Sequence, residues 1–250
     1  ITNYLSELPY EEVTIRHLLQ HTSGLPAYED VLKEYWEGDE DEDFITNDEL
    51  IALYADNELE LDSAPGRKYE YSNTGYVFLA SIVERASEVS FEDFVRQGIA
   101  EPLGLENFFA FRRPNKPPKR VVQGFTGEEG EREDYTYNFV DGMIGDGNVF
   151  ASAEDLAAYT YALFGGHLVE QSTFKEALKP ARLKGGKTYP YGFGWELESD
   201  TFVSHTGCWE AYNTYLGVDI ESEYIYIVLS NGDNGGIHDG IAKAMEDFYD

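Results

Sequence analysis

The sequence holds a single cysteine, Cys208, so no disulfide can form within the chain. It has no apolar run long enough to span a membrane, and no signal-peptide pattern is visible. Basic residues are scarce, since 18 Lys and Arg stand against 48 Asp and Glu, for a formal net charge of −30. Nucleic acid and anionic membrane surfaces carry charge of the same sign, so the sequence argues against both as partners and against membrane insertion by this chain.

The hydrophobic spacing indicates a mainly helical region over residues 1–185. Four polar residues are expected to cap helices, each just before an apolar stripe at helical spacing: Thr14, Asn47, Ser90 and Ser152. A further helix is predicted from the stripe that begins at Tyr76. Residues 111–137 are rich in proline, glycine and charge, which predicts an irregular surface loop or lid.

After residues 185–186 the period changes from helical to alternating. Extended runs over 201–205, 212–218 and 223–230, joined by short polar turns, predict an antiparallel sheet. Residues 237–248 repeat at helical spacing and predict a closing helix on that sheet. The predicted fold class is therefore α+β, with a mainly helical domain over 1–185 and an antiparallel sheet with a C-terminal helix over 186–250.

Tyr71, Ser72 and Asn73 form a polar turn that runs straight into the predicted helix of Tyr76. A titratable phenol and an amide placed just before an amphipathic helix suit a functional site on a rigid scaffold. The residues alone leave a plainer interpretation open, in which Tyr71 is a core tyrosine and Asn73 a helix cap.

Four segments in order along the chain carry a family resemblance: LLQHTSGLP at 18–26, Tyr-Ser-Asn at 71–73, GDGNVFASAEDLAAY at 145–159 and Ser-His-Thr-Gly-Cys at 204–208. Together they resemble the serine β-lactamase and penicillin-binding-protein superfamily, in its class C and esterase-like branch. The resemblance spans nearly all of the chain. It implies a β-lactamase/transpeptidase-like fold, and an acyl-enzyme mechanism on ester, amide or β-lactam carbonyls.

The resemblance implies roles for two residues of the Tyr-Ser-Asn turn. Tyr71 matches the tyrosine that shares the nucleophile's proton with a lysine. Because a phenol has a reference pKa of about 10, this role needs nearby positive charge, which the lysine and His205 would supply. Asn73 matches the asparagine that orients this lysine and the substrate's amide or ester oxygen.

His205 stands where many relatives have the lysine of Lys-Thr-Gly. A histidine is cationic only below about pH 6.5 unless its environment perturbs it. The resemblance therefore favours esters or amides over β-lactams and peptides that carry a free carboxylate.

The same resemblance implies substrate contacts beside His205. Thr206 and Gly207 would continue the strand edge along which the substrate lies, and the backbone N–H of Cys208 falls where the family has its second oxyanion donor. The Cys208 thiol itself is expected to pack as a small side chain. Trp209 and Tyr212, with the proline-rich loop, are candidates for the apolar walls of the pocket.

One departure from the family pattern concerns the nucleophile. The family's Ser-x-x-Lys motif lies upstream of the LLQHTSGLP segment, and this sequence begins at Ile1, just before that segment. A Ser-x-x-Lys string at 172–175 follows Tyr-Ser-Asn and is interpreted as chance. We expect the N-terminal strands and nucleophile helix to be absent, which leaves an unpaired sheet edge. The chain is then expected to be inactive alone and to need a complementing N-terminal segment or a second polypeptide.

Two functions from different classes remain open. The first is a serine hydrolase of the esterase, β-lactamase or D-peptidase type, which acts on a small-molecule ester, amide or peptide. The second is a catalytically inactive relative that uses the same cleft to bind a cell-wall peptide or regulate a partner. The presence of Tyr71, Asn73 and His205 together favours the hydrolase.

No cofactor is expected. His17 and His21 lie four residues apart, which invites a zinc interpretation, but no glutamate or third ligand accompanies them as in the metalloprotease pattern. The family resemblance favours an extracytoplasmic location, either periplasmic or secreted.

Overall fold

The computed structural model describes residues 1–116, 118, 121–127, 132–232 and 240. The chain divides into two compact units, each described here by itself. Residues 1–118 and 137–195 form the first, called the helical unit, and residues 119–136 and 196–250 form the second, called the sheet unit. The sequence boundary after residue 185 falls inside the helical unit. Whether either segment folds independently stays a prediction.

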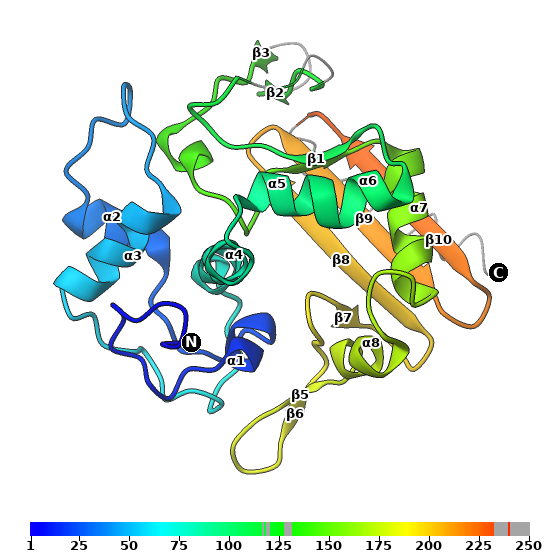
Figure 1. The fold of residues 1–250 in the computed structure, drawn as a ribbon, viewed down its shortest axis with the longest axis horizontal. Helices are drawn as coiled ribbons and strands as arrows, with labels where there is room; N and C mark the ends of the chain where they lie inside the picture. Colours follow the sequence, from blue (N-terminus) through cyan, green and yellow to red (C-terminus); the bar gives the residue numbers. More distant parts are fainter. Residues whose placement is uncertain (117, 119–120, 128–131, 233–239, 241–250) are drawn as a thin grey trace. The chain divides into compact units, whose positions relative to one another are not determined.

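In the helical unit, short helices and two pairs of very short strands lie around one long helix, α4 (Figure 1). Its elements in chain order are α1 (Ile15–Leu19), α2 (Tyr28–Tyr35), α3 (Asn47–Asp56), α4 (Asn73–Ser87), α5 (Phe91–Val95), the π-helix η1 (Arg96–Ala100), α6 (Glu101–Leu103), β1 (Phe108–Ala110), the 3₁₀-helix η2 (Phe139–Gly142), β4 (Val149–Ala151), α7 (Ala153–Phe164), α8 (Gln171–Ala177), β5 (Ala181–Arg182) and β6 (Thr188–Tyr189). Strand β1 pairs with β4, and β5 with β6, both antiparallel.

Three of the four expected caps are confirmed. The side chains of Thr14, Ser90 and Ser152 each accept a hydrogen bond from a backbone N–H in the first turn of the helix that follows. The expectation for Asn47 is wrong, because Thr46 caps α3 and accepts from Glu49 N at 3.2 Å. The sequence places two good capping residues side by side, and the reciprocal contact with Glu49 selects Thr46.

Helix α2 was not predicted. It begins after Ala27, and no side chain caps its first turn, so it lacks the signal that marked the other helices. Its Tyr28, Val31 and Leu32 are buried and hold it in the core of the helical unit.

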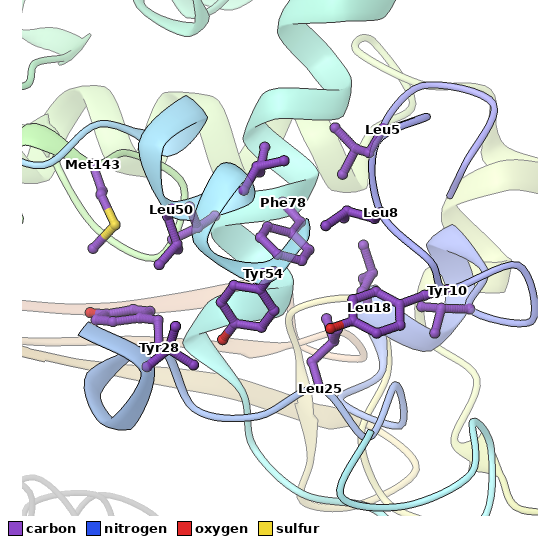
Figure 2. Packing of buried hydrophobic residues seen from close by; sticks show 14 of the residues in the cluster. Leu5, Leu8, Tyr10, Leu18, Leu25, Tyr28, Leu50, Tyr54, Phe78 and Met143 are labelled. Carbon is purple, nitrogen blue, oxygen red and sulfur yellow. The ribbon is translucent and has the colours of Figure 1, made fainter. Parts of the chain in front are cut away.

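The main core of the helical unit lies among α1, α2, α3 and α4. Figure 2 shows Tyr54 and Phe78 at its centre, with their rings edge to face at 5.2 Å between centroids. Both side chains are 0% exposed. The hydroxyl of Tyr54 donates to Pro26 O at 2.7 Å, so this buried phenol keeps a polar partner. The core therefore fixes the segment before α2 against α3.

The sheet unit is an antiparallel sheet in the order β10-β9-β8-β7. Its strands are β7 (Glu196–Leu197), β8 (Phe202–Trp209), β9 (Tyr212–Asp219) and β10 (Tyr224–Ser230), with the small hairpin β2 (Phe125–Thr126) and β3 (Glu133–Asp134). Figure 1 draws β8, β9 and β10 side by side, from yellow to orange. The expected antiparallel sheet is confirmed, and its central strand β8 runs four residues past the expected end at 205. The expected helix over 237–248 lies outside the described residues.

Among the described residues, no helix combines the length and the apolar character that crossing a membrane requires.

Candidate active site

The Tyr-Ser-Asn turn lies in the helical unit, at the start of α4. Ser72 is the N-cap, with its hydroxyl oxygen accepting from Gly75 N at 3.3 Å, and Asn73 is the first helical residue. Tyr71 is 53% exposed. The plainer interpretation of these residues is therefore wrong on both counts, since Tyr71 is no core tyrosine and Asn73 is not the cap.

The start of α4 is fixed against the segment before α2. Thr74 is buried, donates its hydroxyl to Pro26 O at 2.9 Å and accepts from Tyr28 N at 3.0 Å. The Asn73 amide donates to Glu29 Oε1 at 3.5 Å, the long limit of a hydrogen bond. The Asn73 side chain is thus half-buried and only weakly held, on a backbone that is firmly held.

His21 is the buried centre around which the turn is built. Its side chain is 1% exposed, and its Nδ1 accepts from the backbone N–H of Ser72 at 3.0 Å. The His21 carbonyl accepts from Glu70 N at 2.8 Å. The imidazole also packs against the ring of Tyr71, with 4.1 Å between centroids. His21 therefore contacts Glu70 and the first two residues of the turn.

His17 and His21 do not share a helical face, which the zinc interpretation would require. Helix α1 ends at Leu19, and His21 follows with a φ of 51°, which turns the chain out of the helix. The Nδ1 of His17 accepts instead from Thr14 N at 3.3 Å as part of the α1 cap. The described residues contain no cluster of three or more potential metal ligands.

Tyr191 and Tyr76 continue the polar contacts of His21. The Nε2 of His21 lies 3.0 Å from the Tyr191 hydroxyl, while the Tyr76 ring stacks on the imidazole at 5.0 Å between centroids and its hydroxyl donates to Leu19 O at 3.1 Å. Burial raises the pKa of both phenols far above the ordinary value, so both stay protonated and serve as hydrogen-bond links. Sequence reasoning missed both residues, because Tyr76 was assigned only to an apolar stripe and Tyr191 to no motif.

Asp146, a half-buried acid, contacts Tyr28, the first residue of α2. Tyr28 donates its hydroxyl to Asp146 Oδ2 at 3.0 Å, and burial raises the pKa of Asp146 to about 6. Gly145 has a φ of 128° and packs so closely on α4 that a Cβ would lie 2.3 Å from Tyr76 O. The sequence showed this acid inside the GDGN segment, but nothing local indicated its burial.

The His-Thr-Gly stretch lies on β8 in the sheet unit. His205 is half-buried, and its Nδ1 lies 2.6 Å from Thr206 O. Because a carbonyl oxygen only accepts, this Nδ1 carries a hydrogen. Ser204, just before it, is buried and donates to Glu198 Oε1 at 3.0 Å.

Strand β8 has a partner along only part of one edge. Strand β7 pairs with Val203 and Ser204, so from Thr206 to Cys208 no described strand lies on that side. On the other side, Trp209 pairs with Tyr212 across a two-residue turn. A two-residue hairpin closes on a hydrogen-bonded pair, and such pairs alternate along the ladder. The backbone groups of Thr206 and Cys208 therefore point to the open edge.

The other residues expected at the substrate, from Gly207 to Tyr212, differ in exposure and in their contacts. The expectation that Cys208 packs as a small side chain is wrong, because Cys208 is exposed. Gly207 packs where a Cβ would lie 2.3 Å from Thr214 Oγ1. The Tyr212 hydroxyl donates to Val122 O at 2.8 Å. Trp209 is half-buried at the end of β8. Tyr212 thus holds the segment around Val122 within the sheet unit, in addition to the role in the pocket wall expected for it.

The Ser-x-x-Lys string at 172–175 lies on the surface helix α8. Ser172 and Lys175 are both exposed. This placement agrees with the interpretation of the string as chance.

A family model described as Beta-lactamase matches residues 1–248. Penicillin-binding protein 4* of Bacillus subtilis (strain 168) is 32% identical over 263 residues, which cover 98% of this chain and 57% of that protein. A putative penicillin-binding protein, PbpX, of the same organism is 25% identical over 236 residues, covering 94% and 55%. The chain thus spans little more than half the length of these two relatives.

Solved structures give the same assignment for the fold. A penicillin-binding protein from Bacillus halodurans superposes with a TM-score of 0.78 at 23% identity, over 96% of this chain and 76% of that chain. D-amino acid amidase from Ochrobactrum anthropi SV3, complexed with L-phenylalanine, gives a TM-score of 0.74 at 25% identity, over 92% and 67%. The β-lactamase/transpeptidase-like fold is confirmed, and the chain belongs to the Beta-lactamase family, within the superfamily of serine β-lactamases and penicillin-binding proteins.

Proposed function

We propose that this chain carries the proton-transfer and oxyanion parts of a serine hydrolase that forms an acyl-enzyme on ester, amide or β-lactam carbonyls. The nucleophilic serine and its lysine would come from a Ser-x-x-Lys segment before Ile1. The observation that carries the proposal is the phenol of Tyr71, which is 53% exposed on a backbone fixed by His21 and by the start of α4. Family membership supports the reaction class.

In the proposed reaction the serine oxygen attacks the carbonyl carbon while its proton passes to Tyr71, acting as a phenolate beside the lysine. The same proton then goes to the leaving oxygen or nitrogen as its bond to the carbonyl carbon breaks. A water molecule repeats the cycle on the acyl-enzyme, so the products are a carboxylic acid and an alcohol or amine. Asn73 would orient the lysine and the substrate, a role that its weak contact with Glu29 permits.

The negative charge on the carbonyl oxygen would be stabilised by two backbone N–H groups, one from the serine and one from Cys208. The direction of the Cys208 N–H toward the open edge of β8 supports this role. The substrate would lie along the same edge, against Thr206 and Gly207, with Trp209 and Tyr212 near the pocket wall.

Esters and amides without a free carboxylate are the proposed substrate class. His205 replaces the lysine that would bind a carboxylate, and its Nδ1 hydrogen is already directed at Thr206 O. The net charge of −30 also repels anionic substrates. We expect an activated neutral ester to be hydrolysed faster than a penicillin, and comparable rates would contradict the preference.

The test uses the protein expressed with whatever its gene encodes before Ile1. The preparation is incubated with an acyl phosphonate, and its mass is measured, because attack by a serine displaces the leaving group and adds the phosphonyl group. We expect a stoichiometric mass shift and a Tyr71→Phe variant that loses ester hydrolysis about 10²- to 10⁴-fold. Tyr161→Phe is the matched control, since Tyr161 is 68% exposed on α7.

No mass shift would favour the alternative, a catalytically inactive relative that binds a peptide or regulates a partner.

Refolding the 250 residues alone to a cooperatively melting monomer would contradict the need for a complementing segment. An extracytoplasmic location belongs to the same proposal, and protease accessibility in intact cells tests it.

A further inference from the structure

We infer that His21 is a positioning residue for Tyr71: it holds the phenol through the Ser72 backbone and through ring packing, as a neutral imidazole with its hydrogen on Nε2. This inference rests on the proposed function, in which Tyr71 moves a proton. His21 lies outside the residues that the sequence assigned to the chemistry.

The hydrogen bonds around His21 fix where its hydrogen lies. The Ser72 backbone N–H can only donate, so Nδ1 must be the acceptor at 3.0 Å. Nε2 then carries the hydrogen and donates to the Tyr191 hydroxyl at 3.0 Å. The Tyr76 hydroxyl, whose ring stacks on the same imidazole, donates to Leu19 O at 3.1 Å.

Both hydrogen bonds of the imidazole agree on one arrangement. A hydrogen added to Nδ1 would face the Ser72 N–H, and the two donors would repel each other. The alternative tautomer, with its hydrogen on Nδ1, has the same conflict. The Ser72 contact therefore requires the neutral Nε2–H form, which the Tyr191 hydroxyl stabilises.

Ring packing adds a second constraint on Tyr71. Four tyrosine rings surround the imidazole, with centroid distances of 4.1 Å for Tyr71, 5.0 Å for Tyr76, 4.8 Å for Tyr191 and 6.0 Å for Tyr69. The rings of His21 and Tyr71 are tilted by 30° and partly stacked. Half of the Tyr71 side chain is exposed, and this packing and the Ser72 contact both hold its buried half in place.

Two amide replacements test the hydrogen bonds of the two His21 nitrogens one at a time. In His21→Asn the Oδ1 lies near the position of Nδ1 and can still accept from Ser72 N–H. In His21→Gln the amide reaches the position of Nε2 and contacts Tyr191, but the Ser72 contact is lost. Both variants remove the ring and keep an amide, so they are matched in polarity.

The ester assay is run on the protein with whatever its gene encodes before Ile1. We expect His21→Gln to lower kcat about 10- to 100-fold with KM within about twofold, because a displacement near 1 Å costs up to about 10²-fold in rate. The kcat of His21→Asn should be at least about fivefold higher than that of His21→Gln. In a Tyr71→Phe background, His21→Gln should change the rate less than about twofold, because coupled residues are not additive.

Equal losses in the two His21 variants, or the same loss in the Tyr71→Phe background, would overturn the inference. A Tyr71→Phe variant of full activity would refute the proposed function instead, so the two failures are distinguishable. If neither His21 variant folds, ¹⁵N NMR of the wild-type imidazole decides. We expect a hydrogen on Nε2 and none on Nδ1 from pH 6 to 8, and the opposite tautomer or a cationic ring would refute the inference.

Discussion

Asn47 offers a sharp test of how the helical unit is held together. Its side chain is 2% exposed, and its amide nitrogen donates to Ile144 O at 2.9 Å and to Val77 O at 3.1 Å. Its amide oxygen accepts from Ile144 N at 2.8 Å. One carboxamide therefore joins α3 to α4 and to the segment that carries Asp146.

Asn47→Ala removes these contacts in a site that water does not reach. The residue Ile144 is 0% exposed, so its N–H and C=O lose their partner without gaining a water molecule. Each buried polar group left unsatisfied costs about 1–3 kcal/mol, and two of them give an expected loss of about 2–6 kcal/mol in the free energy of unfolding. This is far larger than the loss of an ordinary surface hydrogen bond.

The assay is urea unfolding followed by tryptophan fluorescence, with the complementing segment present if the chain requires it. Asn57→Ala is the matched control, because Asn57 lies at the other end of α3, is exposed, and donates to Leu53 O at 2.9 Å. We expect the control to change the free energy of unfolding by less than about 0.5 kcal/mol. A loss in Asn47→Ala no larger than in this control would refute the account of Asn47 as the link between α3, α4 and Ile144.

Two further predictions concern the acid beside α2 and the edge of β8. Burial raises the pKa of Asp146 from 3.8 to about 6, so the folded state holds a proton that the unfolded chain releases. Stability should therefore fall as the pH rises from about 4 to about 6, by up to about 3 kcal/mol, and pH-dependent unfolding of Asp146→Asn should lack this fall. Cys208→Ala should leave ester hydrolysis within about twofold, whereas Cys208→Pro, which deletes the N–H at an open edge, should lower kcat about 10²- to 10³-fold. Similar rates in the two Cys208 variants would exclude the oxyanion role.

Much of the fold follows from local sequence signals. The caps at Thr14, Ser90 and Ser152 and the strands after residue 200 were predicted because each depends on neighbours within a few positions. Helix α2 has a buried face but no capping side chain, so the same rules passed over it. Thr46 caps α3 through a local contact with Glu49, whereas Asn47 is held by Ile144, which lies far away in the sequence.

The candidate site shows that a local sequence pattern indicates the chemistry available to a residue, but not the contacts that the residue makes in the fold. His21 was weighed as a metal ligand because it lies four positions after His17, yet α1 ends between them. Its partners Ser72 and Tyr191 lie 51 and 170 positions away, and no periodicity within a helix or strand reports such distances. A buried polar side chain must find partners wherever the fold supplies them. The residue that sequence reasoning placed at the chemistry, Tyr71, therefore depends for its orientation on one that only the three-dimensional contacts identify.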